Sequence, residues 1–253
     1  LITLLLNNSN AVVTLGKSSK ILQNSAAKFE SILDALENAK IFIHLEYYIF
    51  ADDVIGRRII SILKRKAAEG VEVRLIVDDV GSWELKKPFF KEMWDSGIQA
   101  YSFLQVRFPN LTSKVNYRNH RKIIVIDGLI GFLGGINIAD RYMNGSSEYG
   151  IWRDTHMKIE GDAVNTLQTV FLIDWFFVSQ TELHDPKYFP SRKPTGQKMV
   201  QIVASGPDSD WPAIMMGIFH AIASAKKYVF IATPYFTPSE SVLLAMKTAA
   251  LGG

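Results

Sequence analysis

Cysteine is absent from the 253-residue sequence, which excludes disulfide bonds and zinc sites built from thiolates. Long apolar runs are also missing, since no uninterrupted stretch comes near the ~18 residues that cross a bilayer. The formal net charge is only +3, too small by itself to predict nucleic-acid binding. No signal peptide is evident. What is present is a chain with 48% hydrophobic residues, enough to bury a sizeable core.

Helical and strand patterns alternate through most of the chain. Apolar residues recur at helical spacing in some segments, and β-branched and aromatic residues fill the segments between them. This alternation predicts an α/β layer with largely parallel strand pairing. The expected elements are helices near 29–36, 55–70, 89–94 and 165–183, and strands near 41–50, 71–79, 98–104 and 151–161.

A segment rich in proline, residues 185–197, predicts a linker, and the pattern of helix, strand and helix restarts beyond it. ENAKIFIHLEYYIF aligns loosely with ASAKKYVFIATPYF, so a strand is expected at 226–236. We therefore expect a first half at residues 1–184 and the start of a similar second half at 198–253. Because the sequence begins without Met and stops where a strand should follow, we expect a piece of a longer protein.

An apolar hairpin in residues 116–137, NYRNHRKIIVIDGLIGFLGGIN, carries polar residues at its open end. Its Asp127-Gly128 pair is a strong signal for a two-residue turn. With that pair at the turn centre, the residues before and after it face each other, and His120 lies opposite Gly135. Glycine offers no side chain there, so the register predicts a hole beside the histidine.

The polar residues of the hairpin separate onto two faces. Side chains alternate along a strand, so His120 and Lys122 point to one face and Asp127 to the other, where we expect a structural role in the turn. Asn137 follows on the histidine face. This set suits an anionic tetrahedral group, because Lys and Asn donate to oxygens and His attacks or transfers a proton. A histidine beside basic residues is more often a solvated strand end, but the spacing of the whole set argues against chance.

The spacing His120-x-Lys122-x4-Asp127-x6-Gly134-Gly135-x-Asn137 resembles the signature of the phospholipase D superfamily. The segments EYYIFADDVIGRRI, VDDVGS, GGINIADRY, WRDTHMKIEG and ATPYFTPSES look like those of bacterial cardiolipin synthases. The resemblance covers nearly the whole chain in the expected order. It implies a phospholipase D-like α/β/α layered fold with a mixed sheet, present as a first half and the start of a second.

The resemblance also implies a mechanism without metal or other cofactor. One histidine attacks phosphorus to form a phosphohistidine, and a second one protonates the leaving alcohol; His120 is either the nucleophile or this acid/base partner. Lys122 and Asn137 would hold the phosphate oxygens. A carboxylate after the hairpin would hold the other ring nitrogen of the histidine, with Asp154 as the first choice and Glu148 as the alternative.

Four residues are candidates for substrate binding: Gly135, Glu46, His44 and Arg118. His44 and Glu46 share a face of a strand that should be covered on both sides. They either line the headgroup pocket or form a satisfied buried His–Glu pair. Arg118, with Arg121, would form a basic rim toward anionic lipid, although surface charges are usually just solvated.

Other features remain without a firm role. His156 would point to the same face as Asp154 but has no predicted function. His184 and His220 are expected to be structural or solvated. The aromatic segment FLIDWFFV is either a core helix or part of a lipid-facing surface.

The resemblance implies a phosphatidyltransferase that condenses two phosphatidylglycerol molecules to cardiolipin and glycerol. The expected partners are this anionic phospholipid, the membrane surface and the protein's own remaining second half, without nucleic acid. The expected location is the cytoplasmic face of the cell membrane. One alternative is a phosphodiesterase that hydrolyses phospholipid or, less readily, nucleic acid, because water and alcohols compete for the same intermediate. Another is an inert interaction module whose second motif has decayed.

We expect this chain alone to be inactive. In-line displacement at phosphorus needs an attacking group and a proton donor on opposite sides of the phosphate. One hairpin cannot supply both.

Overall fold

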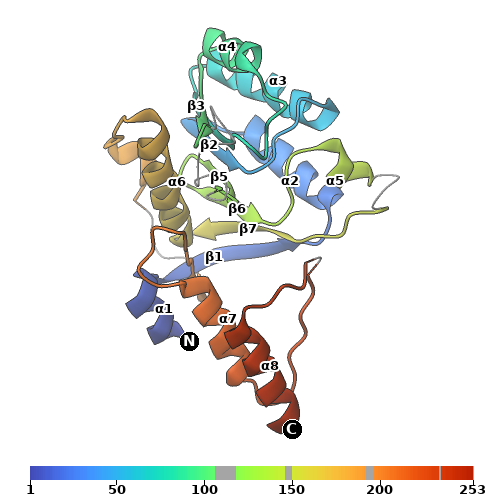
Figure 1. Cartoon of the computed structure of the whole chain (residues 1–253). Coiled ribbons are helices and arrows are strands. Elements are labelled where there is room, and N and C mark those ends of the chain that lie inside the picture. The colour runs from blue at the N-terminus through green and yellow to red at the C-terminus, as the bar shows by residue number, and fades with distance from the viewer. Residues whose placement is uncertain (106–117, 146–149, 192–195, 234, 253) are drawn as a thin grey trace. The chain divides into compact units, whose positions relative to one another are not determined.

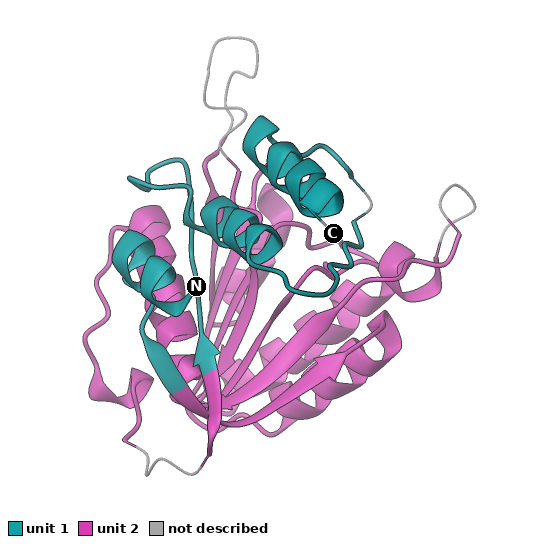
Figure 2. Cartoon of the chain, turned by 90° about the horizontal axis from the view of Figure 1, so that it is seen from below, with its two compact units in different colours: residues 1–14, 200–253 teal, residues 15–199 magenta. Residues whose placement is uncertain are grey.

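The computed structural model describes residues 1–105, 118–145, 150–191, 196–233 and 235–252. These residues form two compact units (Figure 2): residues 1–14 with 200–253, and residues 15–199. The boundary near residue 200 lies close to the predicted start of the second half. Residues 1–14, which we expected in the first half, belong to the same unit as the C-terminal segment.

An eight-stranded mixed sheet is the centre of the fold (Figure 1). Its strands are β1 (Val13–Leu22), β2 (Phe42–Tyr47), β3 (Glu72–Asp78), β4 (Ile98–Phe103), β5 (Lys122–Ile126), β6 (Ile130–Gly134), β7 (His156–Gly161) and β8 (Lys198–Gln201). They lie in the order β4-β3-β2-β5-β6-β7-β1-β8. Parallel pairing joins β2 to β3 and β3 to β4, whereas β2–β5, β5–β6, β6–β7 and β7–β1 are antiparallel. The α/β class and the mixed sheet are confirmed, but largely parallel pairing holds only for β2 to β4.

Helices cover both faces of the sheet in the larger unit. In Figure 1, α6 lies on one face, and α2 and α3 lie on the other. The helices are α1 (Ile2–Ser9), α2 (Ser25–Glu37), α3 (Val54–Ala68), α4 (Lys87–Asp95), α5 (Asp140–Asn144), α6 (Ala163–Ser179), α7 (Ala213–Ala223) and α8 (Glu240–Gly252), with a 3₁₀ turn η2 at Pro186–Tyr188. The starts of α2 and α3 are capped by the side chains of Asn24 and Asp53, which accept from backbone N–H groups three residues on.

Strand β2 is buried along its whole length because both of its faces are covered. Ile43 and Leu45 belong to the main apolar core with α2, α3 and α4. The alternate residues, His44 and Glu46, therefore point to the α6 side. The ring of His44 stacks on Phe171 of α6, with centroids 4.4 Å apart. Polar residues in this strand are thus buried under a helix and need partners there.

Helix α6 contains the aromatic segment whose role was open. Phe171 and Trp175 are fully buried against the sheet, whereas Ile173 and Phe177 are half exposed or more. The segment is a core helix on one side, and its other side is an apolar surface.

The turn between β5 and β6 is one residue longer than expected. Ile126 pairs with Ile130, so Asp127, Gly128 and Leu129 form the loop, and the predicted register was wrong by one residue. Asp127 and Gly128 both have positive φ, 53° and 62°, and Leu129 N donates to Ile126 O at 2.9 Å. The error leaves the faces of β5 unchanged, because alternation within one strand does not depend on its partner.

The strand expected at 226–236 is not formed. The described residues of this segment have neither helix nor strand, and Tyr228 and Phe230 are 71% and 87% exposed. A strand needs a neighbour for its backbone hydrogen bonds, and no strand pairs with this segment in the described part of the chain. The flanking helices, α7 and α8, were predicted from the repeat.

Candidate active site

The open end of the hairpin brings His120 and Lys122 beside the end of β2. Lys122 pairs with Tyr47, and the ring of His120 lies 4.6 Å from that of Tyr48, centroid to centroid. The His120 side chain is exposed. Within the described ranges no group forms a hydrogen bond to either of its ring nitrogens. The imidazole is therefore accessible to a ligand at this edge of the sheet.

Lys122 is buried but has unused donors. Its ammonium donates to His120 O at 2.7 Å and lies 5.1 Å from the centre of the Tyr48 ring. An ammonium carries three protons, and the described residues provide only this one hydrogen-bond acceptor. Burial lowers the pKa of Lys122 to about 8, while the negative charges of Asp154 and Asp78 oppose the shift. The side chain is thus a cation at neutral pH, with protons free for an anion.

The charge state of His120 suits nucleophilic or general-base chemistry. Burial lowers its pKa, and the neighbouring Lys122 lowers it further, while Asp78 acts in the opposite direction. The imidazole is therefore neutral at pH 7, and one nitrogen has a free lone pair. This form can attack phosphorus or accept a proton.

Asn137 is held in place on both sides of its amide. Its Oδ1 accepts from Ile49 N at 3.1 Å, and its Nδ2 donates to the hydroxyl of Tyr142 at 3.0 Å. One amide proton remains for an acceptor such as a phosphate oxygen. The side chain is 5% exposed, so the amide is almost covered by the protein.

Asp154 fills the space that Gly135 leaves. A Cβ on Gly135 would overlap with the Asp154 carboxylate, so this glycine admits a carboxylate of the same chain. Asp154 Oδ1 accepts from Thr155 N at 2.6 Å. The negative charge of Asp154 partly offsets the lowering of the Lys122 pKa by burial. Among the described residues it makes no hydrogen bond to His120. The orienting role of Asp154 stays a prediction, and Glu148 lies outside the described residues.

Asp127 lies at the opposite end of the hairpin. Its carboxylate accepts hydrogen bonds from the N–H groups of Lys40, Ile41 and Phe42 at 2.8, 2.7 and 2.9 Å. It is 7% exposed. The structure thus gives this motif residue a task in joining the turn to the start of β2.

His44 belongs to a closed polar network. Its ring nitrogens lie 3.1 Å from the side-chain amide of Gln168 and 3.1 Å from Arg74 Nη1. Arginine can only donate, so Nε2 of His44 accepts and Nδ1 carries the proton. Burial and the charge of Arg74 lower the pKa of His44 to about 3. Of the two alternatives for His44, a buried pair with Glu46 is not formed, because Gln168 and Arg74 are its partners. Its ring is fully buried, so a role in lining the headgroup pocket stays a prediction without support from its exposure.

The two arginines beside His120 are both engaged with carboxylates. Arg118 Nη1 lies 3.7 Å from Asp78 Oδ1, and its side chain is 12% exposed. Arg121 forms an ion pair with Asp174 of α6. A basic rim toward lipid stays a prediction, and in this geometry the guanidinium groups already have counter-charges.

The structure adds Lys28, which the sequence analysis missed. This fully buried residue of α2 donates to the backbone oxygens of Ile136 and Asn137, both at 3.0 Å. Burial and then the charge of Lys122 lower its pKa. Lys28 thus fixes the backbone at Asn137, the residue predicted to hold a phosphate oxygen. A signal existed in the sequence, because Lys28 interrupts the apolar face of its helix four residues before Ile32.

His156 also lies at this end of the sheet. It is 1% exposed, and neither ring nitrogen has a hydrogen-bond partner among the described residues. A Cβ on Gly134 would overlap with it, so glycine is required there. Burial, with Lys28 and Lys122, lowers the pKa of His156 to about 2, and the ring is neutral.

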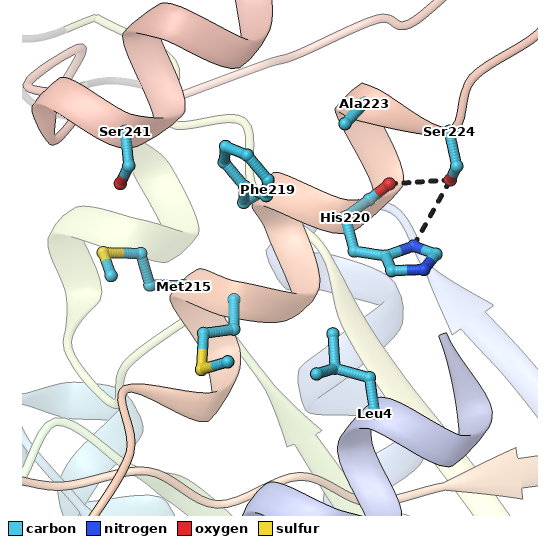
Figure 3. Close-up of a pocket in the computed structure, with 8 residues that line it drawn as sticks. Leu4, Met215, Phe219, His220, Ala223, Ser224 and Ser241 are labelled. Carbon is cyan, nitrogen blue, oxygen red and sulfur yellow. Dashed lines mark hydrogen bonds between the residues drawn. The ribbon is translucent and has the colours of Figure 1, made fainter.

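A separate apolar pocket of about 540 Å³ lies within the smaller unit (Figure 3). Leu4, Met215 and Phe219 line it, and His220 at its side contacts Ser224, whose hydroxyl lies 3.3 Å from Nδ1. None of the motif residues belongs to this unit.

The described residues contain neither a cluster of metal-ligating side chains nor a helix able to cross a membrane. No group of three or more His, Asp or Glu side chains in these ranges is arranged to hold a metal ion. No helix there combines the length and the apolar character needed to cross a membrane.

The family model "Cardiolipin synthase, PLD-like domain" matches residues 32–175, which include the hairpin and Asp154. Cardiolipin synthase 2 of Bacillus anthracis is 46% identical over 237 residues, 93% of this chain and 46% of the relative. Cardiolipin synthase of Listeria monocytogenes is 43% identical over 255 residues, 100% of this chain and 53% of the relative. The chain thus spans about half the length of these curated relatives.

A solved structure has a similar fold. The phosphatidylserine synthase of Haemophilus influenzae matches with a TM-score of 0.68 at 16% identity, over 100% of this chain and 64% of that one. At this identity the likeness concerns the fold alone. The family match covers more than half of the chain and contains the His–Lys–Asn geometry described above. The chain therefore belongs to the family of cardiolipin synthase PLD-like domains.

Proposed function

We propose that the protein is a phosphatidyltransferase that converts two phosphatidylglycerol molecules to cardiolipin and glycerol. The observation that carries the proposal is the open end of the hairpin, where an accessible neutral imidazole adjoins an ammonium and an amide with protons to donate. The names of relatives 43–46% identical over nearly the whole chain support the choice of reaction.

The proposed reaction has two displacements at phosphorus. A histidine attacks the phosphate of phosphatidylglycerol, the bond from phosphorus to the glycerol oxygen breaks, and a second histidine gives that oxygen a proton. The second histidine then takes a proton from the hydroxyl of another phosphatidylglycerol. This hydroxyl oxygen attacks the phosphohistidine, forms cardiolipin and frees the first histidine.

Within this scheme His120 is one of the two histidines, and we favour it as the nucleophile. Lys122 and Asn137 stabilise the charge on the non-bridging oxygens. Lys28 holds the backbone of Asn137. The partners we propose are phosphatidylglycerol and the surface of the membrane, at its cytoplasmic face, without nucleic acid.

The test uses the complete protein with phosphatidylglycerol vesicles. Cardiolipin and glycerol should form in equal amounts, and both should disappear in His120→Ala. Added small alcohols should divert the phosphatidyl group to themselves. Phosphatidic acid as the main product, with or without alcohols, would identify a hydrolase and refute the transferase assignment.

A further inference from the structure

The residues on both sides of His120 are anchored to buried carboxylates. Asn119 N donates to Asp78 Oδ2 at 3.0 Å, and the Asn119 side-chain amide donates to Glu46 Oε1 and, at 3.3 Å, to Asp174 Oδ2. Arg121 N donates to Asn119 Oδ1 at 3.0 Å. The backbone on either side of the histidine is therefore fixed by a single buried asparagine.

Glu46 and Asp174 are two buried carboxyl groups whose protonation has to be explained. Glu46 is 1% exposed and Asp174 of α6 is 6% exposed. The two carboxyl groups are neighbours, because both accept from the side-chain nitrogen of Asn119. Glu46 Oε2 has no hydrogen-bond donor among the described residues. Two ionised carboxylates can only accept hydrogen bonds, so neither could donate to the other. Their like charges would also repel each other at this depth. One proton between them removes the repulsion and supplies the missing donor.

The surroundings agree with a single proton. Burial, and next the charge of Asp174, raise the pKa of Glu46, while Arg121 and Asn119 act in the opposite direction. Arg121 forms an ion pair with Asp174, so one cation lies beside the two carboxyl groups.

We propose that Glu46 and Asp174 share one proton, and that this pair holds Asn119 and thereby positions His120. Glu46 is then a positioning residue and not a ligand of the lipid headgroup. The kinetic test of this inference rests on the proposed function, whereas the spectroscopic test does not. The geometry explains why a glutamate lies on a covered strand face, where His44, two residues earlier, needs a different set of partners.

Replacement by glutamine is the sharpest kinetic test. In Glu46→Gln the amide oxygen accepts from Asn119 and the amide nitrogen donates to Asp174, as the protonated acid does. In the complete protein this variant should keep kcat within about twofold, because the position of His120 is unchanged. Glu46→Ala should lower kcat about 10- to 100-fold with KM nearly unchanged, because it removes a support of the imidazole. The matched control is Gln168→Ala, which removes a buried polar side chain on α6. Among the described residues, Gln168 forms its hydrogen bond with His44 and none with residues 118–121.

A second measurement does not depend on activity. Infrared difference spectra of this chain, wild type minus Glu46→Gln, should show the carbonyl stretch of a protonated carboxylic acid at neutral pH. A missing band would overturn the shared proton, whatever reaction the protein catalyses. A raised KM in Glu46→Gln would restore the headgroup role. An equal loss of kcat in Gln168→Ala would reduce the cluster to a general structural role. If no transfer activity is found but the band is present, the proposed function fails and the shared proton stands.

Discussion

The two ends of the β5–β6 hairpin use their polar residues in opposite ways. At the closed end, the carboxylate of Asp127 accepts three backbone hydrogen bonds and is nearly covered. At the open end, no described residue forms a hydrogen bond to the His120 ring, and the described residues provide one acceptor for Lys122. Buried polar groups in folded proteins normally have hydrogen-bond partners, and the closed end follows this rule, which stabilises the fold. The unused donors of the open end indicate a ligand that supplies acceptors.

The difference in charge agrees with this view. The open end gathers the ammonium groups of Lys28 and Lys122, and both pKa values are lowered, mainly by burial. Burying cations without full compensation lowers stability, and binding of an anion would offset that loss. The closed end carries a single carboxylate with its donors in place. The comparison makes separate predictions for the activity and the stability of variants at each end.

The largest effect on activity is expected for His120→Ala in the complete protein. Activity should fall by more than about a thousandfold, because the other described imidazole at this end, that of His156, is buried. The free energy of unfolding should change little, since the side chain is exposed. His184→Ala is the control, as the side chain of that histidine is 79% exposed and its ring forms a hydrogen bond only to Glu182 among the described residues. Residual activity within about tenfold of the wild type would sink the assignment.

Lys122→Met should give the next largest loss. Removal of a charged donor to the phosphate should lower kcat/KM by about 10²- to 10³-fold. Steady-state kinetics on phosphatidylglycerol vesicles measure this loss. Lys91→Met, at an exposed ion pair with Asp95 on α4, should behave like the wild type. Equal effects of the two substitutions would mean that general charge, and not the site, attracts the lipid.

The activity should also depend on pH through Lys122. Its pKa of about 8 is below the ordinary value, so the free protein loses this positive charge as pH rises through about 8. Because the charged form binds the phosphate, kcat/KM should be highest below that pH and should fall above it. A pH profile from 6 to 10 would measure this, with roughly tenfold loss per unit on the alkaline side for a single group. A flat profile through pH 9 would contradict the role of the ammonium.

A smaller loss of activity is expected from Lys28→Met. The carbonyl groups of Ile136 and Asn137 would lose their common donor, and Asn137 would be less well positioned. We expect kcat to fall about tenfold. Lys66→Met is the control, because Lys66 is also buried, at 5% exposure, but pairs with Glu69 at the end of α3. If both variants lose similar thermal stability but kcat falls only in Lys28→Met, the effect on kcat comes from the position of Asn137 and not from the loss of a buried charge.

Asp127→Asn should have the smallest effect on activity and the clearest effect on stability. An amide retains one acceptor oxygen and brings N–H groups toward backbone N–H donors. The free energy of unfolding should fall by about 2–4 kcal/mol, from lost hydrogen bonds to a charged acceptor. Urea denaturation of this chain measures it, and kcat of the complete protein should stay within about threefold. A loss of activity as large as that of Lys122→Met would show that the two ends do not differ in function.

The sequence was sufficient to predict on which face the polar residues of the hairpin lie, but not the register of its turn. The placement of His120 and Lys122 on one side was predicted from the alternation of side chains in an extended chain. Both side chains lie beside the ring of Tyr48, although β5 itself begins only at Lys122. The register of the turn was missed because Asp127 and Gly128 both have the positive φ expected of a two-residue turn, yet Leu129 is also in the loop. Local signals do not reveal that one additional residue.

Other residues depend on contacts distant in the sequence. His44 meets Gln168, 124 residues away, and Lys28 meets the backbone of Asn137, 109 residues away. A polar residue on a covered face predicts a partner, but only the packing of α6 and α2 on the sheet identifies it. The strand expected at 226–236 shows the converse, since its apolar pattern gives no strand without a pairing neighbour.

The most direct test of the contrast between the two ends is a titration of this chain with inorganic phosphate, followed by NMR. The account predicts saturable shifts of the His120 ring and the Lys122 ammonium signals, with unchanged backbone amide signals of residues 40–42 at Asp127. In Lys122→Met the His120 shifts should be lost or should need far more phosphate. Phosphate that leaves His120 unchanged, or that shifts it equally in Lys122→Met, would contradict an anion site at the open end of the hairpin.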